Sequence, residues 1–104
     1  MADRPRIYIS GPMSGLPDFN YPAFKEASAA LFRAGWDAAS PAEIGHHDGW
    51  SWEDYMRAAV AMQTTCDFVF MLPGWEQSRG ATIEHALAHV FGQRVMYPQE
   101  PEHG

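Results

Sequence analysis

The sequence predicts an α/β fold in which helices cover both faces of a parallel sheet of about four strands, a three-layer α/β/α sandwich. First, short apolar runs typical of strands alternate with stretches of helical periodicity along the 104 residues. Second, the connections are short, and strands joined through a helix pair in parallel by right-handed crossovers. Third, residues 67–72 are an apolar run bounded by Pro73-Gly74, which is typical of a central strand buried on both faces.

The first part of the chain is predicted to contain two strands and one helix. Residues 6–10 form the first strand, which Gly11-Pro12 ends. A helix follows over about residues 21–34 and stops at Gly35, and residues 36–40 form a short second strand. The helix is expected to bury a face made of Phe24, Ala27, Leu31 and Phe32.

The middle of the chain is predicted to form a loop over residues 42–51 and then a second helix. Ser51 and Asp54 have the spacing of a capping box, so we expect the helix to begin at Ser51 and to end near Gln63. This helix leads directly into the central strand.

The last part of the chain is predicted to contain a helix and an edge strand. Helix formers over about residues 81–91, closed by Gly92, indicate a third helix. Residues 93–97 have the composition of a final short strand. The apolar face of the third helix is expected to comprise Ile83, Leu87 and Val90.

Four strands linked by three helices predict the strand order 2-1-3-4, as in flavodoxin-like and Rossmann-like folds. The first and third strands are then neighbours, so the loops that follow them open side by side and should form one pocket. We expect residues 1–97 to form a single domain and residues 98–104 to be a flexible tail.

Composition limits the possible functions. A net charge of −6 with only seven Lys and Arg residues argues against a nucleic-acid polymer as partner. The single cysteine, Cys66, excludes an intrachain disulfide, and the absence of a signal peptide or long apolar span predicts a cytoplasmic protein without membrane contact. His46, His47 and Asp48 are adjacent, but no second ligand cluster with zinc spacing follows, so neither a metal nor another cofactor is expected.

The turn after the central strand is the strongest candidate for a site. In open parallel sheets ligands bind at the carboxyl ends of the strands, where the N-terminus of the next helix favours anions. Ser78 and Arg79 are placed to hold a phosphate there, and Glu84 follows Gly80 by about one helical turn. Two simpler interpretations stay open: Ser78 serves as an ordinary helix cap, and Glu84 favours the helix dipole without a catalytic role.

The sequence resembles the nucleoside 2-deoxyribosyltransferase superfamily over nearly its whole length. The residues that carry the resemblance are the opening YISGPMSG from Tyr8 onward, Cys66-Asp67 before the apolar strand, and Gly80 with Glu84 four residues later. The turn LPGWEQSRG and the opening motif are most similar to DUF4406, a small, often phage-associated branch related to 2-deoxynucleoside 5′-phosphate N-hydrolases.

The resemblance implies cleavage or transfer of the N-glycosidic bond of a 2-deoxynucleoside, or of its 5′-monophosphate, with Glu84 as the nucleophile. Ser78 stands where the transferases carry an aspartate and the nucleotide hydrolases a phosphate-binding serine, which favours a nucleotide. The remaining residues that the resemblance places at the substrate are Tyr8, Gly11, Pro12, Ser14, Gly74, Arg79 and Gly80.

The chain departs from the superfamily at Ala59, where an aspartate commonly assists proton transfer to the leaving base. Asp54, Arg57 or a neighbouring subunit are the candidate replacements. The alternative function is therefore a non-catalytic nucleotide-binding or sequestering domain. The family forms oligomers, and we expect a homodimer or larger homo-oligomer with residues 52–62 at the interface, because the aromatic residues Trp50, Trp52, Tyr55 and Trp75 exceed what a small core needs.

Overall fold

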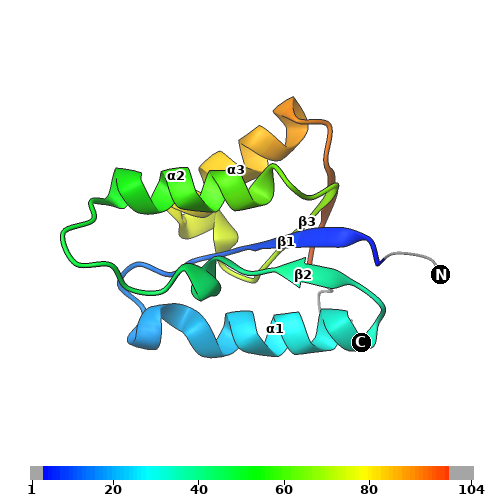
Figure 1. Ribbon diagram of the computed structural model, residues 1–104, viewed down its shortest axis with the longest axis horizontal. Coiled ribbons are helices and arrows are strands. Elements are labelled where there is room, and N and C mark those ends of the chain that lie inside the picture. Colours follow the sequence, from blue (N-terminus) through cyan, green and yellow to red (C-terminus); the bar gives the residue numbers. More distant parts are fainter. Residues whose placement is uncertain (1–3, 99–104) are drawn as a thin grey trace, which may run out of the picture.

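The computed structural model describes residues 4–98, which form one parallel sheet with helices on both faces (Figure 1). The strand order β2-β1-β3-β4 and the parallel pairing confirm the predicted topology. The strands are β1 (Arg6–Ser10), β2 (Asp37–Ala39), β3 (Phe68–Met71) and β4 (Arg94–Met96).

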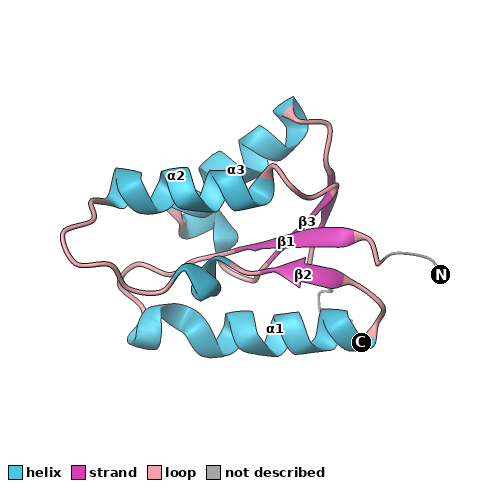
Figure 2. Cartoon of the chain, in the orientation of Figure 1, coloured by secondary structure: helices cyan, strands magenta, loops and turns pink. Residues whose placement is uncertain are grey.

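Helix α1 (Tyr21–Arg33) covers one face of the sheet, and α2 (Trp52–Gln63) and α3 (Arg79–Val90) cover the other, which gives the expected three layers (Figure 1). Figure 2 shows that the connections also contain short helical turns. These 3₁₀ turns are η1 (Pro17–Asn20), η2 (Pro41–Ile44) and η3 (Trp75–Gln77). Of these, η2 overlaps the start of residues 42–51, which were expected to form a loop.

The first strand is the most deeply buried strand of the sheet. Along β1, Ile7 and Ile9 point towards α1, whereas Tyr8 and Ser10 point towards α2 and α3, and all four are fully buried. The strand over residues 67–72, which is β3, was expected to be buried on both faces. This prediction was wrong for one of the two faces. The odd-numbered residues of β3 are buried, whereas Phe68 and Phe70 are half-buried, because α1 lies over β1 and β2.

Local capping signals explain where α2 and α3 begin. The Ser51 hydroxyl accepts the Asp54 amide at 3.1 Å and the Asp54 carboxylate accepts the Ser51 amide at 2.9 Å, so the predicted capping box is formed. Ser78 caps α3 through the Ala81 amide at 3.2 Å. This cap starts α3 at Arg79, two residues earlier than the helix pattern predicts.

The predicted buried face of α3 was wrong at two of its three residues, and the third, Leu87, is half-buried. Ile83 is 37% exposed and Val90 is 74% exposed, whereas the face on the sheet consists of Ala81, Glu84 and Ala88. The spacing of three and four residues is that of a helical stripe. Two small side chains let the helix lie close to the sheet, and they bring the carboxylate between them into the interior.

Phe32 was also expected in the core and is 61% exposed instead. The helix face that packs on the sheet is carried by Phe24 and Leu31. The Arg4 guanidinium lies 4.3 Å from the centre of the Phe32 ring, so this aromatic side chain contacts a cation at the surface.

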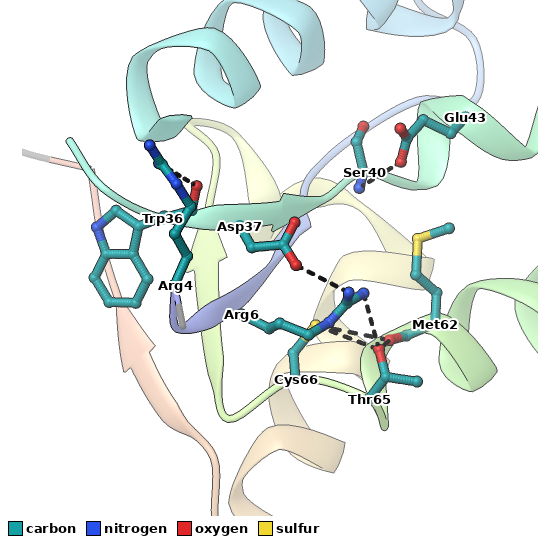
Figure 3. A network of polar contacts seen from close by, with 9 residues as sticks. All are labelled: Arg4, Arg6, Trp36, Asp37, Ser40, Glu43, Met62, Thr65 and Cys66. Atoms are coloured by element: carbon teal, nitrogen blue, oxygen red, sulfur yellow. Dashed lines mark hydrogen bonds and ion pairs between the residues drawn. The ribbon is translucent and has the colours of Figure 1, made fainter. Parts of the chain in front are cut away.

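Polar contacts join the strands near their amino-terminal ends (Figure 3). The Arg6 guanidinium donates to the Asp37 carboxylate at 3.0 Å and to the Thr65 hydroxyl at 3.3 Å, which links β1, β2 and the end of α2. Arg4 donates to the Phe32 and Trp36 carbonyls. Exposed ion pairs of this kind stabilise a fold by only about 0–1 kcal/mol. They lie away from the carboxyl ends of the strands, where the candidate site is found.

None of the helices in the described part of the chain has the length and apolar character that a bilayer crossing requires. The flexible tail predicted for residues 98–104 lies, apart from Pro98, outside the described residues.

Candidate functional site

A cavity of about 500 Å³ opens at the carboxyl ends of β1 and β3, within the size range of small-molecule sites. Its walls come from the loop after β1, the loop between η2 and α2, and the first turns of α2 and α3. The loops after β1 and β3 are in close contact, since a Cβ placed on Gly11 would lie 2.7 Å from Leu72 Cβ. The two loops therefore lie side by side, as the strand order predicts.

Glu84 lies in the lining of this cavity with its carboxylate held by two hydroxyl groups. The Ser10 hydroxyl donates to Glu84 Oε1 at 2.6 Å, and the Tyr8 hydroxyl donates to Oε2 at 2.7 Å. Glu84 itself is only 5% exposed. Both donors come from β1 and lie on the same face of the strand, because residues two apart point in the same direction. A single buried carboxylate is thereby oriented by two strand residues.

The protonation states of this cluster follow from its burial. Burial raises the pKa of Glu84 above its ordinary value, and the hydrogen bonds from Ser10 and from Tyr8 oppose that rise. Burial also raises the pKa of the Tyr8 phenol well above its ordinary value, and the charge of Glu84 adds to this effect. Tyr8 therefore stays protonated and acts as a donor. Buried carboxylates with a shifted pKa in a cavity are typical of functional sites.

We predict that Ser10→Ala raises the pKa of Glu84 further, because it removes a hydrogen bond that lowers this pKa. Tyr8→Phe should act in the same direction. A carbon-13 NMR titration of the Glu84 carboxyl group measures the change. Ser14→Ala is the matched control, since Ser14 lines the cavity and has no hydrogen bond to Glu84. An unchanged pKa in Ser10→Ala would contradict the assignment.

The N-terminus of α3 forms a second part of the cavity. Ser78 and Gly80 line it, and within residues 4–98 the amides of Arg79 and Gly80 have no hydrogen-bond acceptor. Gly80 lies close to α2, since a Cβ on it would be 3.2 Å from Met56 Sδ. Free amides at the start of a helix attract anions. The Ser78 hydroxyl already accepts the Ala81 amide, and its own proton remains available to a ligand.

The structure separates the predicted site residues into two groups. Those that line the cavity are Gly11, Ser14, Ser78, Gly80 and Glu84. The others lie outside the lining. Tyr8 is buried behind Glu84. Pro12 Cγ lies 3.6 Å from where a Cβ of Gly74 would be, so these two residues join the loops. The Arg79 guanidinium lies 3.9 Å from the centre of the Trp52 ring.

Aromatic side chains form one wall of the cavity, a role that was not predicted for them from the sequence. The His47 ring stacks on Trp50 with 4.0 Å between centres, and Tyr55 meets Trp50 edge-on at 5.0 Å. Trp52 lines the same cavity. Trp75 lies elsewhere and stacks on His85 at 4.3 Å. Each of these four aromatic residues has a partner ring or cation within the chain, and the subunit interface expected over residues 52–62 stays a prediction.

The two residues of this chain that were expected to replace an aspartate at position 59, Asp54 and Arg57, do not reach the cavity. Ala59 is buried and lines the cavity. Asp54 is occupied by the Ser51 amide and by Arg57 at 2.9 Å, and the resulting hydrogen bonds with Ser51 lower the pKa of Asp54. Arg57 is exposed in this pair. Neither residue is in the cavity lining.

Two buried residues that donate hydrogen bonds to Glu84, Ser10 and Gln63, were not predicted from the sequence. Ser10 could have been found from its position two residues after Tyr8 on a buried strand. Gln63 is fully buried and donates to the Glu84 carbonyl at 3.0 Å. No local signal distinguishes it from a polar residue at the end of a helix.

Comparison with known proteins identifies the family of the chain and a solved structure of similar fold. A family model described as a domain of unknown function, DUF4406, matches residues 5–97. Among solved structures, a 2-desoxiribosyltransferase from Leishmania mexicana has a similar fold, with a TM-score of 0.69 and 18% sequence identity. The match covers 89% of this chain and 63% of that protein, so the chain spans less than two thirds of its length. No curated protein matches the sequence.

Proposed function

The chain belongs to the DUF4406 family, and from this premise we propose that it cleaves or transfers the N-glycosidic bond of a 2-deoxynucleoside 5′-monophosphate, or of the nucleoside. The observation that carries the proposal is the Glu84 carboxylate, buried in the cavity lining between the Ser10 and Tyr8 hydroxyls. The fold shared with a 2-desoxiribosyltransferase supports it.

In the proposed reaction, Glu84 attacks the anomeric carbon of the sugar as the bond to the base breaks. The transition state has oxocarbenium character, and the product is a sugar ester on Glu84 that another base or water then takes up. Two hydroxyl donors hold the carboxylate in one orientation, and little water surrounds it because the residue is buried. Both features favour a nucleophile that must approach carbon at a defined angle.

The direct test incubates the wild-type protein with a panel of deoxynucleoside monophosphates and deoxynucleosides. Free base is measured by chromatography, with and without a second base as acceptor. Base release without an acceptor indicates hydrolysis, and exchange with an added base indicates transfer. No release from any member of the panel would contradict the proposed reaction.

We expect the monophosphate to bind more tightly than its nucleoside, because the Ser78 hydroxyl and the free amides of α3 face the place proposed for the phosphate. A hydrogen bond to a charged group contributes about 1.5–3 kcal/mol, which predicts a difference of roughly 10–100-fold. Ser78→Ala should reduce this difference. Calorimetric titration of wild type and variant with both ligands measures it.

Ser51→Ala is the matched control for the loss of a helix cap, because Ser51 caps α2 as Ser78 caps α3. Cap loss alone should weaken the fold by about 1 kcal/mol without changing the preference for phosphate. Equal affinities of the wild type for nucleotide and nucleoside would contradict the phosphate subsite.

One observation favours the second candidate, a domain that binds or sequesters nucleotides without turnover. Ala59 lines the cavity where the superfamily resemblance implies an acid for the leaving base. The cavity itself is suited to an aromatic ligand, since His47, Trp50 and Tyr55 present aromatic rings to it. Tight nucleotide binding in a protein that releases no base from the whole panel would support this candidate.

Self-association is a further part of the proposal. Only 19% of residues are charged, and we place the interface on α2, over residues 52–62. We predict a homodimer or larger symmetric assembly that buries on the order of 800 Å² per partner. Sedimentation velocity at micromolar concentration measures it, and a single species of 11.6 kDa would contradict the prediction.

A further inference from the structure

We propose that His46, paired with Asp48, is the acid that protonates the leaving base in place of the aspartate absent at Ala59. The assignment rests on the proposed glycosidic reaction and adds the group that this reaction lacks. Both His46 and Asp48 line the same cavity as Glu84, and they lie in the loop between η2 and α2 (Figure 1).

The geometry of the pair leaves one ring nitrogen for a ligand. His46 Nε2 and Asp48 Oδ1 are 2.9 Å apart, and since an ionised carboxylate only accepts, Nε2 carries the proton of this bond. Nδ1 of His46 has no partner among residues 4–98. The His46 side chain is 72% exposed, so a ligand can reach it directly.

The neighbouring His47 fixes the loop that carries the pair. Its amide donates to the Tyr55 hydroxyl at 2.8 Å, and that hydroxyl donates to the His47 carbonyl at 3.0 Å. Its ring donates to the Ile44 carbonyl at 2.8 Å and stacks on Trp50. The amide, the carbonyl and Nε2 of His47 are thus occupied within the loop, and its ring is held in the stack on Trp50. Among residues 4–98, His46 makes only the side-chain hydrogen bond to Asp48 and no aromatic stack, so we assign the proton transfer to His46.

The cavity lining offers no better donor. Its only carboxylates within the described residues are Glu84 and Asp48, and Glu84 has the role of nucleophile. Histidine exchanges protons near neutral pH, which suits it for general acid catalysis. The aromatic wall of Trp50 and Tyr55 adjoins the loop, so a base stacked on this wall would lie beside His46.

The proposed reaction proceeds in two steps. Glu84 forms a bond to the anomeric carbon, and the electron pair of the breaking C–N bond passes to the base. The imidazolium of His46 gives its Nδ1 proton to the base and keeps its Nε2 proton, which is hydrogen-bonded to the Asp48 carboxylate. In the second step a water attacks the same carbon, Glu84 leaves as carboxylate, and His46 Nδ1 takes the proton of that water.

The experiment compares two leaving groups in the variant His46→Gln. One substrate is the deoxynucleoside monophosphate that the wild type cleaves, and the other is 4-nitrophenyl 2-deoxyribose 5-phosphate, whose nitrophenolate leaves without a proton. General acid catalysis contributes ~10²–10⁴-fold. We expect base release to fall by this factor and nitrophenolate release to stay within about threefold of the wild type. Asp48→Asn should lower base release in the same selective way.

Two controls separate this role from others. His89→Gln changes an exposed histidine on α3 outside the cavity lining and should leave both rates unchanged. Glu84→Gln should lower both rates together. Equal losses with both leaving groups in His46→Gln, or no loss with either, would overturn the assignment of His46 but not the proposed reaction. A wild type that releases neither base nor nitrophenolate would overturn the proposed reaction, and the assignment with it.

Discussion

Glu84→Gln should lower base release by on the order of 10⁴-fold or more, because the amide keeps the shape of the side chain but cannot form the ester with the anomeric carbon. Ligand affinity should stay within a few-fold, since the Ser10 and Tyr8 hydroxyls that hold Glu84 can also bond to an amide. Chromatographic assay of free base, together with calorimetric titration of the ligand, measures both quantities.

The matched control for this substitution is Glu76→Gln, which changes an exposed glutamate in η3. It should leave turnover unchanged. Thermal unfolding verifies that Glu84→Gln still folds. We expect it to be at least as stable as the wild type at neutral pH, because burial raises the pKa of Glu84 and the ionised form is the costly one. Unchanged base release in Glu84→Gln would contradict the covalent mechanism.

Gln63→Ala is predicted to lower the free energy of unfolding by roughly 2–4 kcal/mol, through lost hydrogen bonds and a cavity. Gln63 is fully buried at the end of α2. Its Nε2 donates to the Glu84 carbonyl and to Gln93 Oε1, each at 3.0 Å. Gln93 in turn donates to the Gln63 carbonyl at 2.7 Å and to the Cys66 carbonyl at 2.8 Å. The two amides thus join α2, α3 and the start of β4.

Thermal and urea unfolding measure this loss, which corresponds to a fall in melting temperature on the order of 10–20 °C for a domain of this size. Gln77→Ala is the matched control, since Gln77 is an exposed glutamine in η3. It should change stability by less than about 0.5 kcal/mol. A loss of less than about 1 kcal/mol in Gln63→Ala would contradict the prediction that the hydrogen bonds of Gln63 and Gln93 stabilise the fold.

The arrangement of the elements was predictable because its signals are local. The apolar run that stops before Gly11 defines β1, and the capping box of Ser51 and Asp54 defines the start of α2. Short connections and the handedness of crossovers then lead to the order β2-β1-β3-β4. The same order places the loops after β1 and β3 side by side, so the position of the cavity was predictable too.

The sequence by itself determined the strand order and the edge of the sheet at which the site lies, and its resemblance to a known superfamily suggested Glu84 as the candidate nucleophile. Only the tertiary structure decided which face of α3 is buried and which polar groups surround Glu84. Periodicity defines the faces of a helix, but the space left by the sheet selects the small residues Ala81 and Ala88 over Ile83. Likewise, Ser10 and Glu84 are 74 positions apart. A buried polar group needs a hydrogen-bond partner, and when that partner comes from a distant segment no local pattern identifies it.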